Sequence, residues 1–493
     1  MDESEENKKE INLTRRRYIL SLFIALIIGA AGMYGVDYFL EEEPDPIDEI
    51  SLQEDFALDG QLLLPNAEEF SSLNKMYMIL KNSYFEELDS EILIDGALEG
   101  MSRAIGDPYT EYLNEEQAIS LEEDISGSFQ GIGAEVMKEG EYVRIISPIA
   151  NSPAEEAGLR PNDLVIEVAG ESVAELSITE AVALIRGPEG SEVELLIKRG
   201  TEEFSLTLTR ANIPVETVFY EQDEKDSTIG YVNIVNFNLP TYDETVEAIQ
   251  DLEVKGVEKI IFDVRGNPGG LLTTALQVSN IFVPDGERMM LTEYREDDEP
   301  TEFIASEEYG DFKYEGEAVL LVDEGSASAS EILAGAMQSV DIPIYGQATF
   351  GKGTIQSVAD ISEKEEIKFT VGKWLTANGD WINEDGIQPD QKVELPAYAR
   401  LFVVNTSDSF KEGEASPEVK NLKEVMKALG YKTTDNNVFD QSVIEAIQSF
   451  QKDKNLSADG KVTVETAREI TDALRDKIEE NESQYEAAVK AFN

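Results

Sequence analysis

The sequence predicts a multidomain α/β (α+β) protein with an apolar N-terminal segment, a small β-rich domain, a larger α/β domain and a small all-α module. Three observations carry this prediction. The chain has 493 residues, enough for several domains, and its 41% hydrophobic content supports buried cores. Short β-like runs fill residues 126–210, and strand and helix patterns alternate over 211–400. Helical periodicity returns over 416–475.

The N-terminus predicts a single membrane anchor at 18–36, an unbroken run of apolar and small residues after Arg15, Arg16 and Arg17. The positive-inside rule places residues 1–17 in the cytoplasm and the domains after residue 37 outside it. We therefore expect a single-pass protein of the cell membrane with extracytoplasmic catalytic domains. Cleavage as a signal peptide near Gly29–Ala31 is the alternative, but the apolar run continues past these residues.

The remaining segments follow in order. Residues 37–66 form an acidic linker containing prolines, and 67–125 carry helical periodicity. In 126–210 the predicted strands are 134–136, 142–146, 164–168, 193–198 and 204–209, and with a helix at 178–185 they are expected to form a small, partly open β-barrel. In 211–400 the buried strands are 229–234, 260–264, 318–322 and 342–345, and the helices are 242–252, 271–281 and 330–339. A linker (401–415), a helical module (416–475) and a charged helical tail (476–493) without an evident site complete the chain.

Composition narrows the chemistry. The chain contains no His and no Cys, which excludes a Ser–His–Asp triad, a Cys nucleophile, a His-ligated zinc and disulfides. A hydrolase of this composition would use Ser or Thr with Lys, or carboxylates. The chain has 101 acidic and 40 basic residues, for a net charge of -61, spread along its length. This acidity argues against nucleic-acid binding and is typical of a strongly solvated surface.

Three serines, Ser326, Ser328 and Ser330, follow a predicted strand and lead into a helix. A Ser at such a turn can face a cleft, and N–H groups at the helix N-terminus can stabilise an oxyanion. The alternative is that these small residues only pack and cap the helix.

Lys352 stands between two glycines and precedes Gln356. To act as a base near neutral pH, a lysine must be buried, because desolvation disfavours its charged form. Gln356 is a neutral partner, and in a strand residues 352 and 356 would share a face. Gly346–Lys352 also resembles a phosphate-binding loop, but Gly353 replaces the magnesium-binding Ser or Thr and β-like residues follow.

Two glycine-rich turns complete the candidate set. Asp263–Gly270 ends a buried strand and can direct backbone N–H groups at a developing negative charge. The loop Gly131–Ile132–Gly133 opens the β-rich domain and can capture a terminal carboxylate while the bound peptide adds a strand.

Together these segments resemble the C-terminal processing (tail-specific) serine peptidase family over about residues 70–400. Gly131–Gly133 with Ser152–Asp163 looks like a PDZ domain, and Gly106-Asp107-Pro108-Tyr109-Thr110 is similar to a segment that precedes PDZ in this family. The Gly266–Gly270 turn, the serine segment, the lysine segment and Gly386–Asp390 follow in the family's order.

The resemblance implies roles for matching residues. Ser328 would be the nucleophile, Lys352 the general base and Gln356 its orienting partner. Backbone N–H groups of Ala329 and of Gly269 or Gly270 would form the oxyanion hole. Gly131, Ile132 and Gly133 would bind the peptide carboxylate, and Arg186 would be a gating contact. Ser326 and Ser330 would pack or cap the turn.

The module at 416–475 resembles a three-helix peptidoglycan-binding domain, and the matching residues are Leu422, Leu429–Tyr431, Phe439–Asp440, Ala446, Phe450–Gln451 and Asp459–Gly460. Val462–Thr463 stands where a glycine is common, and the usual Trp is absent. An acidic stretch at 453–459 mimics a calcium loop, but Ala458 occupies the position that needs glycine. We expect no metal and no cofactor.

The predicted function is therefore an endopeptidase that cleaves exported or membrane proteins near their C-termini, with PDZ recognition of substrates. Protein substrates with exposed C-termini, cell-wall peptidoglycan, the membrane and a second copy of the chain are the expected partners. The alternative is a catalytically silent, wall-tethered PDZ scaffold that binds protein C-termini.

Overall fold

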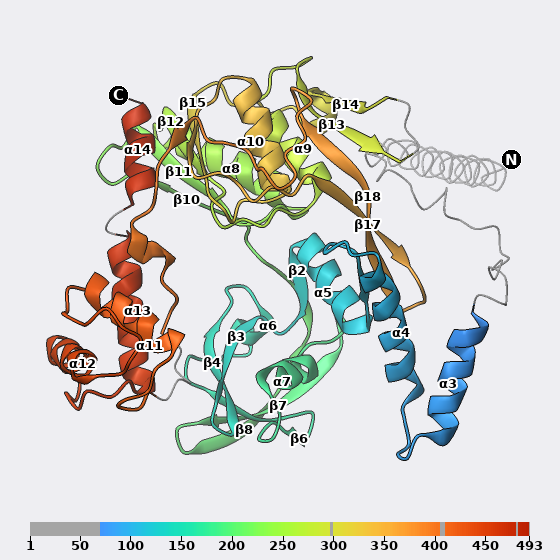
Figure 1. Cartoon of the computed structure of the whole chain (residues 1–493), viewed down its shortest axis with the longest axis vertical. Coiled ribbons are helices and arrows are strands. Elements are labelled where there is room, and N and C mark those ends of the chain that lie inside the picture. Colours follow the sequence, from blue (N-terminus) through green and yellow to red (C-terminus); the bar gives the residue numbers. More distant parts are fainter. Residues whose placement is uncertain (1–69, 296–298, 405–409, 480–481, 493) are drawn as a thin grey trace, which may run out of the picture. The chain divides into compact units, whose positions relative to one another are not determined.

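The computed structural model describes residues 70–295, 299–404, 410–479 and 482–492 (Figure 1). The predicted cytoplasmic tail (1–17), anchor (18–36) and linker (37–66) lie outside these residues. Within the described ranges, no helix combines the length and apolar character needed to cross a membrane. The chain divides into two units, residues 1–94 and 95–493.

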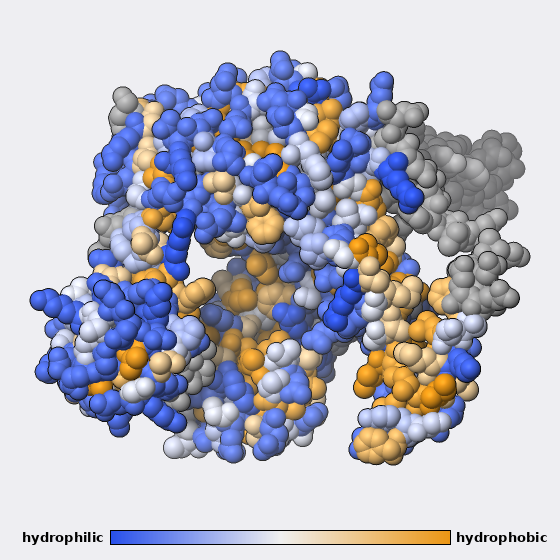
Figure 2. Space-filling view, viewed as in Figure 1, coloured by the Kyte–Doolittle hydropathy of each residue, from blue (hydrophilic) through white to orange (hydrophobic). Residues whose placement is uncertain are grey.

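The first unit contains α3 (Ser71–Ser83), and α4 (Ser90–Ala104) begins within it. No residue of α3 is buried. Met76 and Ile79 are 58% and 54% exposed, and Figure 2 shows hydrophobic residues gathered over this helix. The described part of the unit thus leaves an apolar face uncovered.

The β-rich domain has strands β3 (Ala134–Glu139), β4 (Tyr142–Pro148), β5 (Leu164–Val168), β6 (Glu171–Ser172), β7 (Glu192–Arg199) and β8 (Glu202–Thr209). They form an antiparallel sheet of order β3-β4-β5-β7-β8, with β6 on β5. Helices α6 (Pro153–Glu156) and α7 (Ile178–Ile185) accompany the sheet. The five predicted strands and the predicted helix are confirmed.

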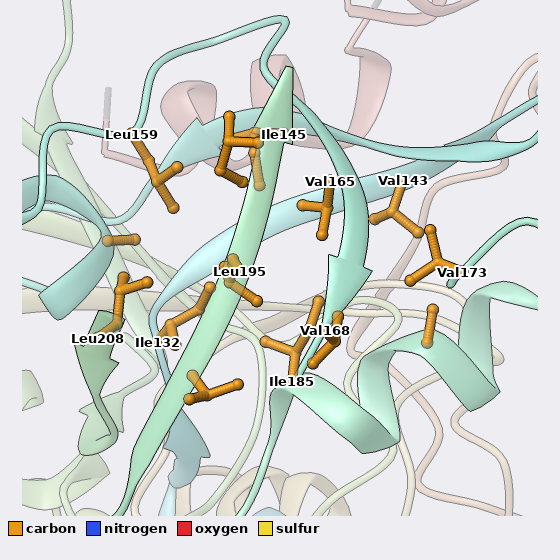
Figure 3. Packing of buried hydrophobic residues seen from close by; sticks show 14 residues of the cluster. Ile132, Val143, Ile145, Leu159, Val165, Val168, Val173, Ile185, Leu195 and Leu208 are labelled. Carbon is orange, nitrogen blue, oxygen red and sulfur yellow. The ribbon is translucent and has the colours of Figure 1, made fainter. Parts of the chain in front are cut away.

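Alternating apolar positions on these strands form one core, which includes Ile145, Val165 and Leu195 (Figure 3). Each of these three side chains is fully buried. One face of each strand therefore turns inward, as the period of two along a strand requires.

The larger domain is built on a six-stranded sheet of order β10-β11-β12-β15-β16-β19. These strands are β10 (Val218–Gln222), β11 (Ile229–Ile234), β12 (Lys259–Asp263), β15 (Glu317–Val322), β16 (Ile344–Gly346) and β19 (Gln391–Lys392). Only the β10–β11 pair is antiparallel. The helices are α8 (Thr241–Val254), α9 (Leu272–Asn280) and α10 (Ala329–Ser339). The four predicted buried strands form the centre of this sheet.

A second sheet supplies the lysine segment. Its path is β1-β18-β13-β14, and β17 pairs with β18. The strands are β1 (Glu111–Leu113), β13 (Arg288–Tyr294), β14 (Thr301–Ile304), β17 (Thr354–Asp360) and β18 (Glu366–Thr376). Helix α5 (Glu115–Ser126) follows β1. Strand β2 (Ser128–Gly131) enters the β-rich domain and β9 (Ala211–Pro214) leaves it, and the two strands pair antiparallel.

The module contains α11 (Pro417–Ala428), α12 (Gln441–Asp453) and α13 (Val464–Glu479) around a shared apolar core. Two polar residues that carry the resemblance to a peptidoglycan-binding domain stabilise the fold of this module. Asp440 caps α12 by accepting the Ser442 N–H at 3.0 Å. Buried Gln451 accepts the Gly460 N–H at 2.9 Å and closes the following loop.

The segment 476–493, predicted as a charged helical tail without an evident site, packs on the sheet of the larger domain. Helix α13 continues to Glu479, and α14 (Ser483–Ala491) packs on β12, β15 and β16 (Figure 1). Tyr485, Ala488 and Phe492 share an apolar cluster with the sheet residues Ile229, Ile261, Val319 and Leu321. Tyr485, Ala488, Val489 and Phe492 lie at helical spacing and form the apolar face of α14.

Candidate active site

Ser328 lies at the turn between β15 and α10, as predicted. Its backbone has φ 53° and ψ -112°, a sparsely populated conformation for a residue with a side chain. Ser326 and Ser330 are fully buried, and their hydroxyls donate to Val264 O at 2.8 Å and Asn267 O at 3.0 Å. The outer serines thus fix the turn, while Ser328 itself is only half-buried.

Glu331, in the first turn of α10, is a site residue that the sequence reasoning missed. Its fully buried carboxylate accepts the N–H groups of Ser328 at 2.7 Å, Lys352 at 2.9 Å and Gly351 at 2.7 Å. It also accepts the Thr349 hydroxyl at 2.6 Å. The only sequence signal was a carboxylate three residues after a helix N-cap, which is common at helix starts.

Lys352 precedes β17 and is half-buried. Burial lowers the pKa of Lys352, and the positive charge of Lys368 lowers it further. The carboxylates of Glu331, Asp107 and Glu111 raise this pKa, but the net effect is a lowered value. Its Nζ lies 4.8 Å from the centroid of the Tyr109 ring. Within the described part of the chain, no hydrogen bond joins it to Ser328 Oγ. Long catalytic contacts are common in substrate-free enzymes.

The strand argument for Gln356 is wrong in detail. β17 begins at Thr354, after Lys352, and its register shifts between Ile355 and Gln356. Because such a bulge interrupts the alternation of side chains, residues 352 and 356 cannot be placed on one face by counting. Gln356 Nε2 donates to the hydroxyls of Thr354 at 3.0 Å and Thr370 at 3.1 Å.

The glycine turn 266–270 lies directly against the serine turn. Gly269 has φ 107°, and a Cβ there would stand 2.7 Å from Ala327 O and 3.0 Å from Ala329 N. Only glycine permits this approach. The Gly269 N–H donates to Asn267 Oδ1 at 2.8 Å, so it is already engaged. Among the described residues, the N–H groups of Gly270 and Ala329 make no hydrogen bond.

The predicted carboxylate-binding loop passes close to Ser152 at Gly133. A Cβ at Gly133 (φ 73°) would stand 2.3 Å from Ser152 Cβ, so this approach requires a glycine. Ile132 is buried, and its carbonyl accepts the Ala154 N–H at 2.8 Å. Gly131 ends β2.

Arg186 caps the C-terminal end of α7. Its guanidinium pairs with Glu123 of α5 and lies 5.0 Å from the Phe129 ring centroid on β2. Arg186 thus links the end of α7 to α5 and β2.

The segments that resemble a phosphate-binding loop (346–352) and a calcium loop (453–459) have other roles in the structure. Residues after Gly346–Lys352 continue as the strand β17, where a phosphate loop would continue as a helix. Asp453 accepts the Tyr431 hydroxyl at 2.7 Å, while Asp459 accepts the Lys461 N–H at 2.9 Å. Over the described ranges, no group of three acidic side chains is arranged to hold a metal ion.

Family models match four parts of the chain. They are "Peptidase family S41" at 228–393, "PDZ domain" at 144–199, "Activating protease CtpB N-terminal domain" at 26–117 and "Putative peptidoglycan binding domain" at 415–470.

Individual proteins match over most of the chain. The carboxy-terminal processing protease CtpA of Bacillus subtilis is 41% identical over 86% of this chain and 90% of its own length. A probable CtpA-like serine protease of Staphylococcus epidermidis is 37% identical over 84% of each. The solved photosystem II D1 C-terminal processing protease is 28% identical over 66% of this chain and 88% of its own, with a TM-score of 0.38.

Proposed function

This chain belongs to the carboxy-terminal processing proteases of peptidase family S41, with a PDZ domain, and we propose that it cleaves peptide bonds with Ser328 as nucleophile and Lys352 as general base. The observation that carries this proposal is the shared Glu331 carboxylate. It accepts hydrogen bonds from the backbone N–H groups of both residues, which supports a role for them in one site.

The proposed reaction proceeds through an acyl-enzyme. Neutral Lys352 Nζ takes the Ser328 hydroxyl proton while Oγ attacks the scissile carbonyl carbon. The N–H groups of Ala329 and Gly270 stabilise the oxyanion, and Gly269 lets the two turns approach. The Lys352 ammonium then protonates the leaving amine. A water molecule, deprotonated by Lys352, hydrolyses the ester. Gln356 orients Lys352 through its carboxamide.

Replacement of Ser328 by Ala tests the assignment. The variant is expected to lose cleavage of an unstructured protein such as casein, while Ser362→Ala, on an exposed hairpin, retains it. Normal cleavage by Ser328→Ala would refute the assignment. Acylation of Ser328 by an active-site reagent, detected by mass spectrometry, separates an enzyme from the alternative, a silent PDZ scaffold.

For substrates, we propose exported or membrane proteins with exposed C-termini. The PDZ domain would bind the terminal carboxylate at Gly131, Ile132 and Gly133 and the last residues as an added strand. Arg186 would transmit this occupancy, since it bridges α7, α5 and β2. Proteins retained by the Ser328→Ala variant in cells would identify the natural substrates. Retention of internal segments only would contradict C-terminal recognition.

The proposed location is the cell membrane, with residues 18–36 as an uncleaved anchor and the catalytic domains outside the cytoplasm. The apolar run and the preceding arginines support it. Extraction by alkaline carbonate, or protection from external protease in intact cells, would contradict this topology.

For the module at 415–470 we propose binding to cell-wall peptidoglycan, supported by the family match. Co-sedimentation of the full chain with purified insoluble walls tests it. Equal sedimentation after removal of 415–470 would count against it.

A homodimer is also proposed, supported by the exposed apolar residues of α3. Light scattering should report a dimer that Met76→Asp with Ile79→Asp converts to a monomer. A monomeric wild-type chain would refute it.

A further inference from the structure

The segment Gly106-Asp107-Pro108-Tyr109-Thr110 has no part in the reaction proposed above, yet the structure brings it to the base. It lies between α4 and β1, far from the catalytic turns in sequence. The Tyr109 ring faces Lys352, with Nζ 4.8 Å from the ring centroid. Both side chains are half-buried.

Asp107 holds this segment in a fixed turn. Its Oδ1 accepts the Tyr109 N–H at 3.0 Å, and its Oδ2 accepts the Thr110 hydroxyl at 2.6 Å. Burial opposes ionisation of Asp107, but hydrogen bonds from Thr110, Thr370 and the Tyr109 N–H hold its pKa below the ordinary value. The carboxylate is therefore ionised at working pH and keeps the Tyr109 backbone in place.

The same turn is tied to β18, which pairs with the strand that carries Gln356. The Thr370 N–H of β18 donates to Thr110 Oγ1 at 3.2 Å, and Thr110 in turn donates to Asp107. Gln356 Nε2 donates to the Thr370 hydroxyl at 3.1 Å. A hydroxyl can donate one bond and accept another, so Thr110 connects Asp107 with Thr370, which also contacts Gln356. These hydrogen bonds join the Tyr109 turn to the strands beside Lys352.

We propose that Tyr109 is a positioning residue for Lys352: its ring, held by Asp107, covers the amine, keeps water from it and limits the positions that Nζ adopts. This rests on the proposed role of Lys352 as the base. Burial raises the pKa of Tyr109 itself, with Glu331, Asp107 and Glu384 adding to the effect, so the phenol stays neutral.

Two effects of the ring oppose each other. The ring face attracts an ammonium, whereas the exclusion of water disfavours one. Hydration of an ammonium is the stronger of the two, so removal of the ring should make Lys352 harder to deprotonate. The other charged groups acting on Lys352 are Lys368, Glu331, Asp107 and Glu111, and these stay unchanged in a Tyr109 variant.

The test measures the protonation of Lys352 in two independent ways. The first is the ascending limb of kcat/KM against pH for wild type, Tyr109→Phe and Tyr109→Ala. The second is the pH dependence of Lys352 modification by an amine-reactive reagent, read by mass spectrometry in the Ser328→Ala background. The second readout needs no activity. It reports the ring's effect even if Lys352 proves not to be the base.

Tyr109→Phe keeps the ring and is expected to match wild type in both midpoints. Tyr109→Ala is expected to move both midpoints upward by about one pH unit, a tenfold change in the proton affinity of the amine. An unchanged or lowered labelling midpoint in Tyr109→Ala would overturn the proposal. So would an equal shift in Tyr109→Phe, which would assign the effect to the hydroxyl.

Tyr112→Phe is the matched control. Tyr112 lies on β1, next to the same segment, and its hydroxyl donates to Asp95 at 3.1 Å and Glu365 at 2.7 Å. Its loss should lower thermal stability without moving the labelling midpoint of Lys352. A shift in Tyr112→Phe as large as that in Tyr109→Ala would mean that general loosening, not the Tyr109 ring, sets the protonation, and would overturn the proposal.

Discussion

The backbone N–H groups of Ser328 and Lys352 donate to the same oxygen, Oε2 of Glu331, at 2.7 and 2.9 Å. The proposed nucleophile and the proposed base are therefore both hydrogen-bonded through their backbones to one buried carboxylate, although they belong to different turns. The separation of the two turns is set by two hydrogen bonds to a single atom.

Replacement of Glu331 by Gln should lower kcat by about 100-fold, because a carboxamide offers one acceptor oxygen where the carboxylate offers two, and misplacement of about 1 Å costs that much. Steady-state kinetics on a quenched peptide measures it. Glu324→Gln, in the turn that precedes α10 and with its side chain 66% exposed, is the control and should behave like wild type. Wild-type kcat in Glu331→Gln would contradict a positioning role.

Activity should rise with pH, since Lys352 must be neutral to accept the Ser328 proton. Burial lowers the pKa of Lys352, so the rise should be centred below the ordinary lysine value. Salt should increase activity near neutral pH, because the many carboxylates favour the ammonium and their field is screened within about 8–10 Å. A flat profile from pH 6 to 9 at low salt would count against Lys352 as the base.

Asp163→Asn should destabilise the PDZ domain by about 3 kcal/mol, because Asp163 is 1% exposed and pairs with Arg199. Burial raises the pKa of Asp163, but Arg199 and the Arg160 N–H lower it more, so the net pKa is depressed. Its stabilisation is present above the ordinary value of about 3.9 and is lost as pH falls through the folded value.

Thermal unfolding of both forms at pH 7 and below pH 4 measures this. The difference between wild type and Asp163→Asn should shrink at the lower pH. Glu156→Gln, at an exposed position of the same domain, should unfold like wild type at pH 7. A difference that persists undiminished at low pH would show that the charge of Asp163 is not the cause.

The C-terminal helix should support catalysis through Arg265, which precedes the glycine turn. Arg265 Nη1 donates to Glu482 at 2.9 Å and Gln484 at 3.0 Å. Glu482→Ala with Gln484→Ala should lower kcat by about tenfold, because the turn that carries the Gly270 N–H loses two supports. Lys490→Ala, whose side chain is 76% exposed, is the control. An unchanged kcat in the double variant would show that α14 only covers the sheet.

Arg186→Ala should remove the stimulation of cleavage by a short peptide with a free C-terminal carboxylate. The reason is that Arg186 pairs with Glu123 and lies on Phe129, which join the PDZ helix to α5 and β2. Glu123→Gln should have the same effect, and the double variant should add nothing further. Arg160→Ala, at an exposed position, should keep normal stimulation. Full stimulation in Arg186→Ala would exclude it as a gating contact.

Much of the fold could be predicted from local patterns. The alternation along β4, β5 and β7 and the apolar runs of β11, β12 and β15 mark strands without knowledge of their partners. The sequence could not reveal the bulge at Gln356, because a bulge depends on the register with β18. Nor could it reveal that α14 packs on the sheet, since the partners of its apolar face are strands distant in the chain.

The sequence by itself limited the kind of chemistry: without His or Cys, a hydrolase of this composition would use Ser or Thr with Lys, or carboxylates, and the order of the motifs pointed to Ser328, Lys352 and Gln356 as the proposed site residues. Only the tertiary structure decided what holds that pair. The Glu331 carboxylate, the Tyr109 ring and the α14 contacts join residues distant in the chain. Such contacts arise when sheets and turns close on one another, and no local periodicity records them.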